Sequence, residues 1–557
     1  MMKINIKKKF ILIFFVLITF YVYAAQPELK KEKINIKMSD GTELASDMYS
    51  PEGADKLPVI LIRSPYGKEQ YYKIAKALVE NDYIVISQDV RGTGESGGIN
   101  IAFVNEAKDG FETLQWISIQ KWYNGKIGMW GASYCAYCAD IIASLNTGLL
   151  NSVFSISGGT NLGKSLMPGG AFHLMMNMTW LHFSKIHQDS SLNKYNAADL
   201  MNVIPLINGF SMIGADKDIN EIGHFIGSLA NTETPQNTAF LHMTGWYDFF
   251  NVLTFDLYDE IKSNKGITNK IIIGPWYHDQ IYRDNSKVGD EDFGSEALMG
   301  LKNLTPIIIQ WFDYTLKGKQ NEIANQKDVN VFVMNKNRWE QYDELPPLNS
   351  EEHNLYFSSS GSANSSKGNG VLKTINDYIT NSDSYIFDPL NPVPTYGGAN
   401  FHFFPDNLGV KDQSKIEERN DVLVYTSEAL NESRKIIGNI KIELYASTEG
   451  VSTDFTAKLV EVQQNGYCKI ICDGIKRISK TTPGKIFMIE IELGYTAIEI
   501  LKGNKIRIEI SSSNFPKYDR NPNTGANPLF AEEFNKVKQT VYYGSKYPSK
   551  LILRPLK

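Results

Sequence analysis

The stretch Gly125-Lys126-Ile127-Gly128-Met129-Trp130-Gly131-Ala132-Ser133-Tyr134-Cys135 decides how the first half of the chain folds. Residues 126–130 predict a short strand, and residues 135–145 predict a helix. A serine between a strand and a helix, with small residues two positions away on each side, is typical of the strained turn called a nucleophile elbow. Cys135 stands where this motif usually has glycine, so an ordinary buried serine remains the alternative at this point.

Strand and helix patterns alternate on both sides of this stretch. Residues 34–62 predict strands with a hairpin turn at Ser39-Asp40-Gly41. Beyond them, the predicted strands are 83–87, 126–130, 238–243, 269–273 and 329–334, and the predicted helices are 72–81, 105–120 and 304–317. Such alternation is typical of a mostly parallel sheet with helices on both faces.

Two regions depart from this alternation. The strand pattern disappears between residues 163 and 232, which predicts a helical cap inserted into the sheet domain. After about residue 345, strand patterns recur without helices between them, at 440–446, 456–462, 486–493 and 505–511. We therefore predict an α/β domain of residues 25–162 and 233–345, a helical cap of residues 163–232, and an all-β sandwich of residues 346–557.

The first residues predict a signal peptide. Lys3, Lys7, Lys8 and Lys9 precede the apolar run 10–25, and Val22 and Ala24 have the small-residue spacing of a signal-peptidase site. We expect residues 1–24 to be removed and the protein to be periplasmic or secreted. A retained membrane anchor is the alternative, but this 16-residue run is shorter than the roughly 20 residues that a spanning helix needs.

Composition excludes several classes of protein. Of the 557 residues, 42% are hydrophobic and 21% are charged, which is typical of globular proteins. The 57 Lys and Arg residues against 62 Asp and Glu residues give a net charge of -5, so no basic surface for a nucleic acid is expected. The oligomeric state stays open.

Cysteine and histidine spacing predicts neither disulfides nor a metal site. Cys468 and Cys472 lie in a strand-like run that would hold their Cα atoms about 13 Å apart. Cys135 and Cys138 lie on a predicted helix, where small buried thiols are favoured over a strained bridge. We expect no metal and no cofactor.

A serine hydroxyl needs a base, and the base needs an acid to orient it. Asp248 follows the predicted strand 238–243, and His278 follows the predicted strand 269–273. Both would lie at the carboxyl ends of strands, where α/β sheets form their sites. Among the eight histidines, His278 is the one in a loop just past a core strand. The order Ser133, Asp248, His278 is that of an α/β-hydrolase triad.

Several motifs follow one another along the chain. Besides the stretch quoted first, they are Arg63-Ser64-Pro65-Tyr66-Gly67-Lys68, Gln88-Asp89-Val90-Arg91-Gly92-Thr93-Gly94-Glu95-Ser96-Gly97-Gly98, Gly245-Trp246-Tyr247-Asp248, Gly274-Pro275-Trp276-Tyr277-His278, Phe387-Asp388-Pro389 with Pro392-Val393-Pro394, and Ser513-Asn514-Phe515-Pro516 with Asp519-Arg520-Asn521-Pro522. Along nearly its whole mature length, the chain thereby resembles the cocaine esterase and X-prolyl dipeptidyl-peptidase family of serine hydrolases. The resemblance implies an α/β-hydrolase domain, a helical cap and a C-terminal jelly roll.

The resemblance also implies roles for individual residues. Ser133 resembles the nucleophile that forms an acyl-enzyme, His278 its base, and Asp248 the acid that orients the base. The Tyr66 hydroxyl and the Tyr134 backbone N–H resemble the oxyanion hole of the family. By contrast, Asp89 and Arg91 are predicted to hold a loop by charge-assisted hydrogen bonds rather than to take part in catalysis.

The substrate is less well defined. Relatives in this family include esterases, acylases that act on β-lactam side chains, and X-Pro dipeptidyl-peptidases. A related group of α-amino-acid ester hydrolases recognises the substrate amine through a carboxylate cluster, part of which follows the catalytic Asp. Here Phe249 and Phe250 follow Asp248, so we expect a small neutral acyl or aryl ester or amide, with a short X-Pro peptide as the alternative. The predicted pocket residues are Phe249, Phe250, Trp246 and Trp276, although the Phe pair fits core packing equally well.

A binding protein is the further alternative. The jelly roll resembles carbohydrate-binding modules in general architecture, so the chain could bind a carbohydrate or another ligand beside a degenerate hydrolase domain. The complete set of Ser133, Asp248, His278 and Tyr66 argues against that hypothesis. The sequence therefore favours an exported serine hydrolase.

Overall fold

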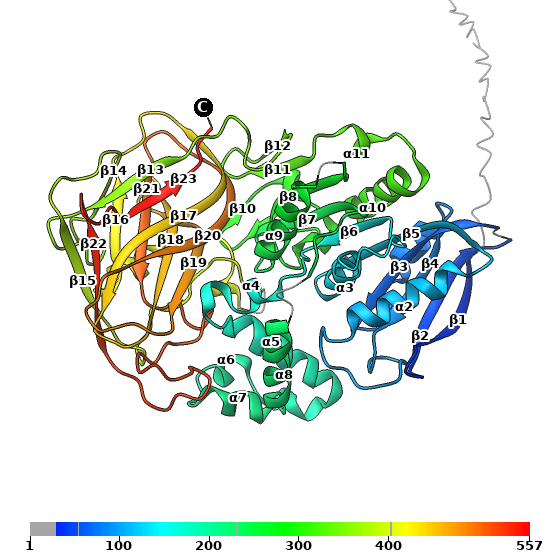
Figure 1. The fold of residues 1–557 in the computed structure, drawn as a ribbon. Coiled ribbons are helices and arrows are strands. Elements are labelled where there is room, and N and C mark those ends of the chain that lie inside the picture. The colour runs from blue at the N-terminus through cyan, green and yellow to red at the C-terminus, as the bar shows by residue number, and fades with distance from the viewer. Residues whose placement is uncertain (1–28, 54, 229–231, 265, 402–403, 557) are drawn as a thin grey trace, which may run out of the picture.

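The computed structural model describes residues 29–53, 55–228, 232–264, 266–401 and 404–556. The predicted signal peptide lies outside these residues. Figure 1 shows two domains side by side, an N-terminal α/β domain and a C-terminal domain rich in strands. A group of helices lies beneath the place where the two domains meet.

The N-terminal domain is built on one sheet whose central strands are parallel. From β4 through β3 and β5 to β11, each described neighbouring pair is parallel, whereas the pairs at both edges are antiparallel. Across the sheet, the strand order is β1 (Leu29–Lys37), β2 (Glu43–Pro51), β4 (Ile84–Asp89), β3 (Leu57–Ser64), β5 (Tyr123–Ala132), β6 (Ser152–Ile156), β7 (Ala239–Tyr247), β8 (Asn269–Tyr277), β11 (Val329–Val333) and β12 (Arg338–Tyr342).

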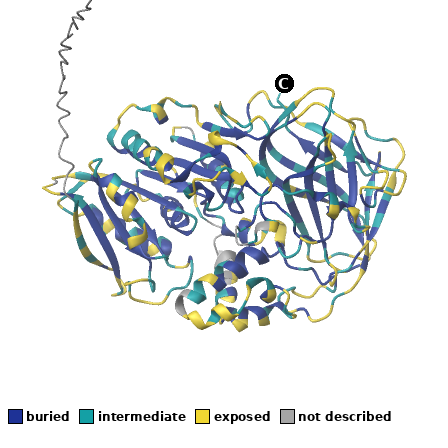
Figure 2. Cartoon of the chain, turned by 180° about the vertical axis from the view of Figure 1, so that it is seen from behind, coloured by how far each residue is buried: buried dark blue, intermediate teal, exposed yellow. Residues whose placement is uncertain are grey.

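Helices cover both faces of this sheet and bury apolar side chains against it, as the dark strands of Figure 2 show. Because neither face meets water, the central strands are continuous apolar runs, and residues 59–62 of β3 are fully buried. One face carries α1 (Tyr72–Val79) and α10 (Gly300–Lys317), and the other carries α2 (Glu106–Ser118), α3 (Tyr134–Ala143) and α9 (Asn251–Lys262).

The chain leaves the sheet after β6 and returns to it at β7. Between these strands it forms helices, in the region where the sequence predicts helices and no strands. Met175, Met178 and Phe210 from this insertion are buried in the same apolar core as α2 and α3. The helices are α4 (Leu162–Leu166), α5 (Leu174–Gln188), α6 (Ala197–Leu200), α7 (Leu206–Met212) and α8 (Asp216–Ser228).

The C-terminal domain consists of strands whose described pairs are antiparallel, except for the parallel pair of β14 and β16. Buried and half-buried residues alternate along β17, so one face of this strand packs in a core. The strand order is β15 (Asn381–Phe387), β22 (Val537–Tyr543), β17 (Arg434–Thr448), β23 (Lys550–Leu553), β13 (His353–Ser358), β14 (Val371–Lys373), β16 (Leu423–Ser427), β21 (Lys505–Ser511), β18 (Thr453–Val462) and β19 (Cys468–Ile478), and β20 (Phe487–Ile500) pairs with β17.

The two domains share one apolar core. Phe255 of α9 stacks on Tyr495 of β20, with ring centroids 4.3 Å apart. Next to this pair, the Trp246 indole packs on Phe255 and donates a hydrogen bond of 2.8 Å to the Phe332 carbonyl oxygen. The C-terminal domain therefore packs, through Phe255, against the Trp246 side chain of β7.

The predicted alternation of strands and helices agrees with the structure, but the sequence pattern did not reveal α9 and β12, nor the central strand β6. This strand reads Ser152-Val153-Phe154-Ser155-Ile156, and its two serines interrupt the apolar run. Both serines are fully buried and bonded. The Ser155 hydroxyl donates to Asp140 at 2.8 Å, and the Ser152 hydroxyl accepts from Thr315 at 2.8 Å.

Charge-assisted hydrogen bonds of Arg91 and Asp89 hold the loop after β4, as predicted, and each residue has its own partners. Arg91 binds Asp109 and Asp40, at 2.6 Å and 2.8 Å. Because Asp109 lies on α2 and Asp40 in the hairpin turn, Arg91 ties the loop to two other parts of the domain.

Asp89 fixes the segment that carries Tyr66. Its buried carboxylate accepts hydrogen bonds from the Lys68 backbone N–H at 2.7 Å and from the Lys68 ammonium at 3.1 Å. The Glu95 backbone N–H adds a third bond of 3.0 Å. Because Lys68 is two residues from Tyr66, the position of Tyr66 depends on this buried ion pair.

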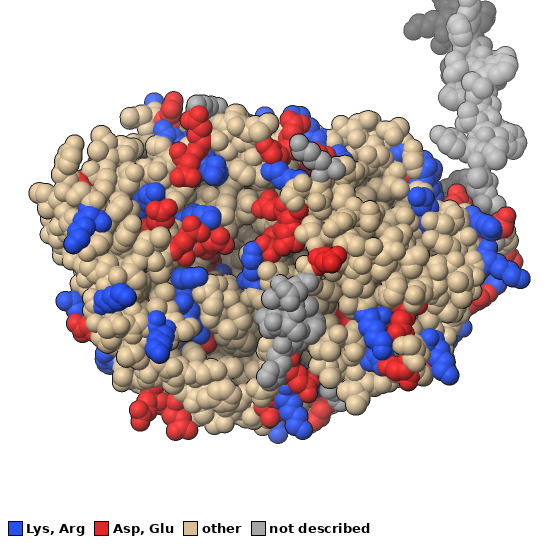
Figure 3. Space-filling view, in the orientation of Figure 1, with Lys and Arg blue, Asp and Glu red and all other residues tan. Residues whose placement is uncertain are grey.

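The surface carries both signs of charge. On the face drawn in Figure 3, acidic and basic residues are interspersed. Among the described helices, none is long and apolar enough to cross a membrane.

We expect Asp89→Asn to lower the free energy of unfolding by about 3 kcal/mol, because it removes a buried charge that compensates the Lys68 ammonium. Urea unfolding curves measure this change. Asp343→Asn is the control, since Asp343 pairs with Lys327 at the exposed surface and its loss should cost about 0.5 kcal/mol or less. Equal destabilisation by both variants would contradict the role assigned to Asp89.

Candidate active site

Ser133 lies at a sharp turn between β5 and α3. Its backbone has φ 57° and ψ −123°, a conformation that strains any residue with a side chain. Gly131 permits the turn, because a Cβ atom there would lie 2.2 Å from the Cys135 carbonyl oxygen. The geometry is that of the predicted nucleophile elbow, and it presents the Ser133 hydroxyl to a cavity.

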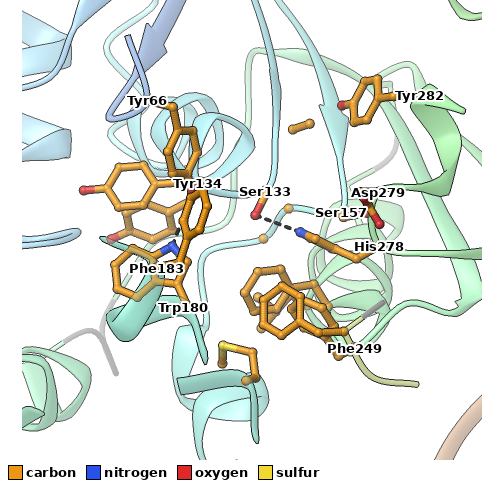
Figure 4. Close-up of a pocket in the computed structure, with 18 of the residues that line it drawn as sticks. Tyr66, Ser133, Tyr134, Ser157, Trp180, Phe183, Phe249, His278, Asp279 and Tyr282 are labelled. Atoms are coloured by element: carbon orange, nitrogen blue, oxygen red, sulfur yellow. Dashed lines mark hydrogen bonds between the residues drawn. The ribbon is translucent and has the colours of Figure 1, made fainter. Parts of the chain in front are cut away.

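His278 and Asp248 lie directly after two neighbouring parallel strands, β8 and β7. Their side chains meet because the carboxyl ends of these strands lie at the same edge of the sheet. His278 Nε2 is 2.9 Å from Ser133 Oγ, and His278 Nδ1 is 2.9 Å from Asp248 Oδ1. Figure 4 shows the bond between Ser133 and His278. The structure thus brings the three predicted triad residues into one hydrogen-bonded chain.

Asp248 is fully buried and accepts further hydrogen bonds. The Phe250 backbone N–H donates to Oδ1 at 2.8 Å, and the Ser157 hydroxyl donates to Oδ2. Ser157 lies in the turn after β6 with φ 52°, so its backbone, like that of Ser133, is strained. Sequence reasoning missed Ser157 because it missed β6. A strand followed by the small residues Ser157-Gly158-Gly159 was the available signal.

The two predicted oxyanion residues lie side by side. The Tyr66 and Tyr134 rings pack edge to face with centroids 6.4 Å apart. Tyr134 is the first residue of α3, so its backbone N–H has no partner within the helix. Burial raises the pKa of Tyr66 well above its ordinary value, so its hydroxyl keeps its proton near neutral pH.

The side chain of Tyr134 also has a structural role. Its hydroxyl donates to Glu106 at 2.9 Å and accepts from the Phe103 backbone N–H at 2.8 Å. Glu106 also forms a fully buried ion pair with Arg63 at 2.7 Å. These contacts hold the start of α3, and with it the Tyr134 N–H, against α2 and β3.

Ser133 and His278 open onto a cavity of about 440 Å³. Aromatic rings form much of its wall, and Phe249 and Phe250 lie against His278 with centroids at 4.4 Å and 5.2 Å. Both predicted Phe residues therefore line the cavity. Further lining residues are Tyr66, Phe103, Tyr134, Tyr137, Leu162, Leu166, Met176, Asn177, Trp180, Phe183, Tyr282 and Phe401.

Trp246 and Trp276, which were predicted as substrate-pocket residues, do not line the cavity at Ser133. The Trp246 side chain packs at the interface with the C-terminal domain. Trp276 is 1% exposed on the other face of the sheet, and its indole donates to the Ala297 carbonyl oxygen at 2.7 Å. Both residues lie inside strands and face covered sheet surfaces, whereas the cavity lies beyond the strand ends.

Acidic side chains are scarce in the described wall of the cavity. Asp279 lines it, and its carboxylate accepts a hydrogen bond of 3.0 Å from Arg283. In the helical insertion, Asp218 pairs with Lys185 at 2.8 Å. Within the described part of the chain, no three His, Cys, Asp or Glu side chains are grouped so that they could hold a metal ion.

A hydrogen-bonded Ser, His and Asp at the carboxyl edge of a parallel sheet defines a serine hydrolase of the α/β-hydrolase class. Residues 40–280 match the family model of the X-Pro dipeptidyl-peptidase (S15 family), and residues 321–552 match that of the X-Pro dipeptidyl-peptidase C-terminal non-catalytic domain. The chain is also 30% identical to a cocaine esterase from Rhodococcus over 570 residues, covering 94% of this chain and 98% of the relative. The protein belongs to this family of serine hydrolases, which includes cocaine esterase.

Solved structures share the fold of the whole chain. An aminopeptidase from a marine sediment archaeon, Thaumarchaeota archaeon, matches with a TM-score of 0.78 at 21% identity, covering 100% of this chain and 99% of the other. An α-amino acid ester hydrolase matches with a TM-score of 0.73 at 22% identity, covering 95% and 97%. At these identities the likeness concerns the fold.

We expect Ser157→Ala to lower kcat about 10-fold or more with little change in KM, because the buried Asp248 carboxylate loses a hydrogen bond worth about 1.5 to 3 kcal/mol. Steady-state kinetics with an aryl ester measure both constants. Ser144→Ala is a matched control, since the buried Ser144 hydroxyl donates to a carbonyl oxygen within α3. If both variants kept the wild-type kcat, Ser157 would have no part in positioning Asp248.

Proposed function

We propose that the protein hydrolyses small neutral aryl or acyl esters, and amides of the same kind, through an acyl-enzyme on Ser133. One observation carries this proposal: the Ser133 hydroxyl, bonded to His278, opens onto a cavity of about 440 Å³ whose wall is largely aromatic and aliphatic. Such a cavity removes apolar substrate surface from water and leaves few polar groups to fix its orientation.

The proposed roles follow from the hydrogen-bonded chain. His278 accepts the Ser133 proton at Nε2 as Ser133 Oγ bonds to the substrate carbonyl carbon, and it then gives that proton to the departing alcohol or amine. Asp248 holds Nδ1 protonated and so fixes the ring orientation. In the second half, His278 takes a proton from water as the water oxygen bonds to the acyl carbon. The bond from the acyl carbon to Ser133 Oγ then breaks, His278 returns the proton to Oγ, and the acid is released.

The negative charge that develops on the substrate oxygen needs donors. We assign this role to the Tyr66 hydroxyl and the Tyr134 backbone N–H. The N–H has no partner within α3, and the helix dipole at this first turn also favours negative charge. The neutral Tyr66 phenol adds a second donor.

X-Pro dipeptidyl-peptidase activity is the second candidate, and the family match over residues 40–280 is the observation in its favour. A free substrate ammonium would have to exchange water for a fixed carboxylate, or lose its hydration without compensation. In the described wall, Asp279 is the acidic residue, and it already binds Arg283. The cavity therefore favours neutral substrates.

We further propose names and bounds for the parts of the chain. The α/β-hydrolase domain comprises residues 25–162 and 233–345, and residues 163–232 form a helical cap, because α4 and α5 supply Leu166, Met176 and Trp180 to the cavity wall. Residues 346–557 form a jelly roll, which the largely antiparallel pairing supports. We also propose that residues 1–24 direct export, on the basis of the lysines before the apolar run.

Ser133→Ala and His278→Ala should each reduce turnover to near background, since the hydroxyl is a poor nucleophile without its base. The double variant should lose no more than either single variant, because the two groups act as a unit. Ester hydrolysis assays measure turnover, and circular dichroism checks the fold. Strictly additive losses would contradict the triad.

A fluorophosphonate probe separates this enzyme from a binding protein. Wild-type protein should be labelled at Ser133, and Ser133→Ala should not be labelled. Absence of labelling in folded wild-type protein would instead support a non-catalytic, ligand-binding protein.

Substrate preference gives the second test of the proposal. We expect kcat/KM to be higher for small aryl esters than for an X-Pro anilide with a free N-terminus, because the cavity offers little to replace the hydration of an ammonium group. The same anilide with an acetylated N-terminus is the control for the size of the substrate. A clear preference for the free-amine anilide would establish the dipeptidyl-peptidase alternative.

A further inference from the structure

Trp180 connects the helical insertion to the oxyanion residues. It lies on α5, and its indole N–H donates a hydrogen bond of 3.3 Å to the Tyr66 hydroxyl oxygen. Figure 4 shows Trp180 and Tyr66 on the same side of the cavity, across from His278. The two residues are 114 positions apart in the sequence.

This bond decides where the Tyr66 proton can go. An indole N–H is a donor only, so Trp180 occupies a lone pair of the Tyr66 oxygen and cannot accept its proton. Among the described residues, the Trp180 bond is the one that the Tyr66 hydroxyl makes. The phenol proton is therefore left for a group in the cavity.

We propose that Trp180 is a positioning residue of the oxyanion hole, which directs the Tyr66 proton toward the substrate oxygen and strengthens its donation. The inference rests on the proposed role of Tyr66. A hydroxyl that accepts a hydrogen bond is polarised and becomes a better donor. The bond thus acts in the transition state, where the substrate oxygen is negative, more than in the ground state.

The indole is itself held in place. Its ring stacks on Phe103 and Tyr134, with centroids 5.6 Å and 6.4 Å apart. Phe103 and Tyr134 also stack on each other at 4.5 Å. This aromatic group includes the residue whose backbone N–H is the other proposed oxyanion donor. Docking of α5 on α3 therefore orders both donors together.

A plain role in the cavity wall is the competing explanation, since Trp180 lines the cavity. The two explanations differ in what the N–H does. A wall residue binds substrate through its ring, so its loss raises KM and is independent of Tyr66. A positioning residue acts through Tyr66, so its loss lowers kcat and has no effect once the Tyr66 hydroxyl is gone.

The test is a double-mutant cycle with Trp180→Phe and Tyr66→Phe, measured as kcat and KM on an aryl ester. We expect Tyr66→Phe to lower kcat about 100-fold. Trp180→Phe should lower kcat about 10-fold, since it removes the N–H and keeps an aromatic ring, with KM within about threefold of wild type. The double variant should match Tyr66→Phe alone.

A second variant removes only the N–H. Replacement of Trp180 by β-(3-benzothienyl)alanine keeps the size of the bicyclic ring and puts sulfur in place of N–H, so it should lower kcat like Trp180→Phe. Trp116→Phe is the control, because Trp116 pairs with Trp122 instead of the catalytic residues. Circular dichroism and thermal unfolding confirm that each variant is folded.

The outcomes separate this inference from the proposed function. Wild-type kcat in the benzothienyl variant, or losses that multiply in the double variant, would overturn the role of Trp180 while leaving Tyr66 in place. A normal kcat in Tyr66→Phe would overturn the oxyanion assignment and the role of Trp180 with it. Loss of fluorophosphonate labelling at Ser133 in wild-type protein would overturn the enzyme itself.

Discussion

The buried carboxylate of Asp248 constrains the rest of the site. A carboxylate without water must be surrounded by donors, and those of Asp248 come from segments far apart in the chain. His278 follows β8, Ser157 follows β6, and the Phe250 N–H lies just before α9. These segments can meet because β6, β7 and β8 are parallel and adjacent. The strained turn at Ser133 then needs only β5 beside β6 to bring the hydroxyl within reach of His278.

Contacts on both faces of the sheet keep these strand ends in place. On one face, the Trp246 indole bonds to β11 and packs beside the C-terminal domain. On the other face, the Trp276 indole bonds to the Ala297 carbonyl oxygen in the segment before α10. Each tryptophan lies two residues before a member of the triad. The C-terminal domain, described by its family model as non-catalytic, therefore contributes to the site by holding the strand that carries Asp248.

Much of the site could be predicted because its proposed catalytic residues stand where local sequence patterns change. Ser133, Asp248 and His278 each directly follow a strand, and strand ends can be found from apolar runs and glycine. Ser157 was missed, because the strand before it contains buried serines that interrupt the apolar run and whose partners, Asp140 and Thr315, lie elsewhere in the chain. Trp246 and Trp276 were misjudged for a related reason: closeness in sequence to the triad says nothing about which sheet face a strand residue covers. The position of Trp180 next to Tyr66 depends on how the helical insertion packs on the α/β domain, and this packing cannot be predicted from helical periodicity.

The sheet and the helical insertion contribute different residues to the site, and this affects substrate selectivity. The sheet supplies the proposed triad, whereas α5 supplies Asn177, Trp180 and Phe183 to the cavity wall. These residues recur every three positions, so they lie on one side of the helix. A charged residue introduced on that side would change which substrates the cavity can accept without their water of hydration. The hydrogen bonds of Asp248 would stay as they are, because none of them comes from α5. Trp180 is the exception, because its ring forms part of the wall while its N–H bonds to Tyr66. A substitution of Trp180 would therefore change both the shape of the cavity and the hydrogen bond to Tyr66.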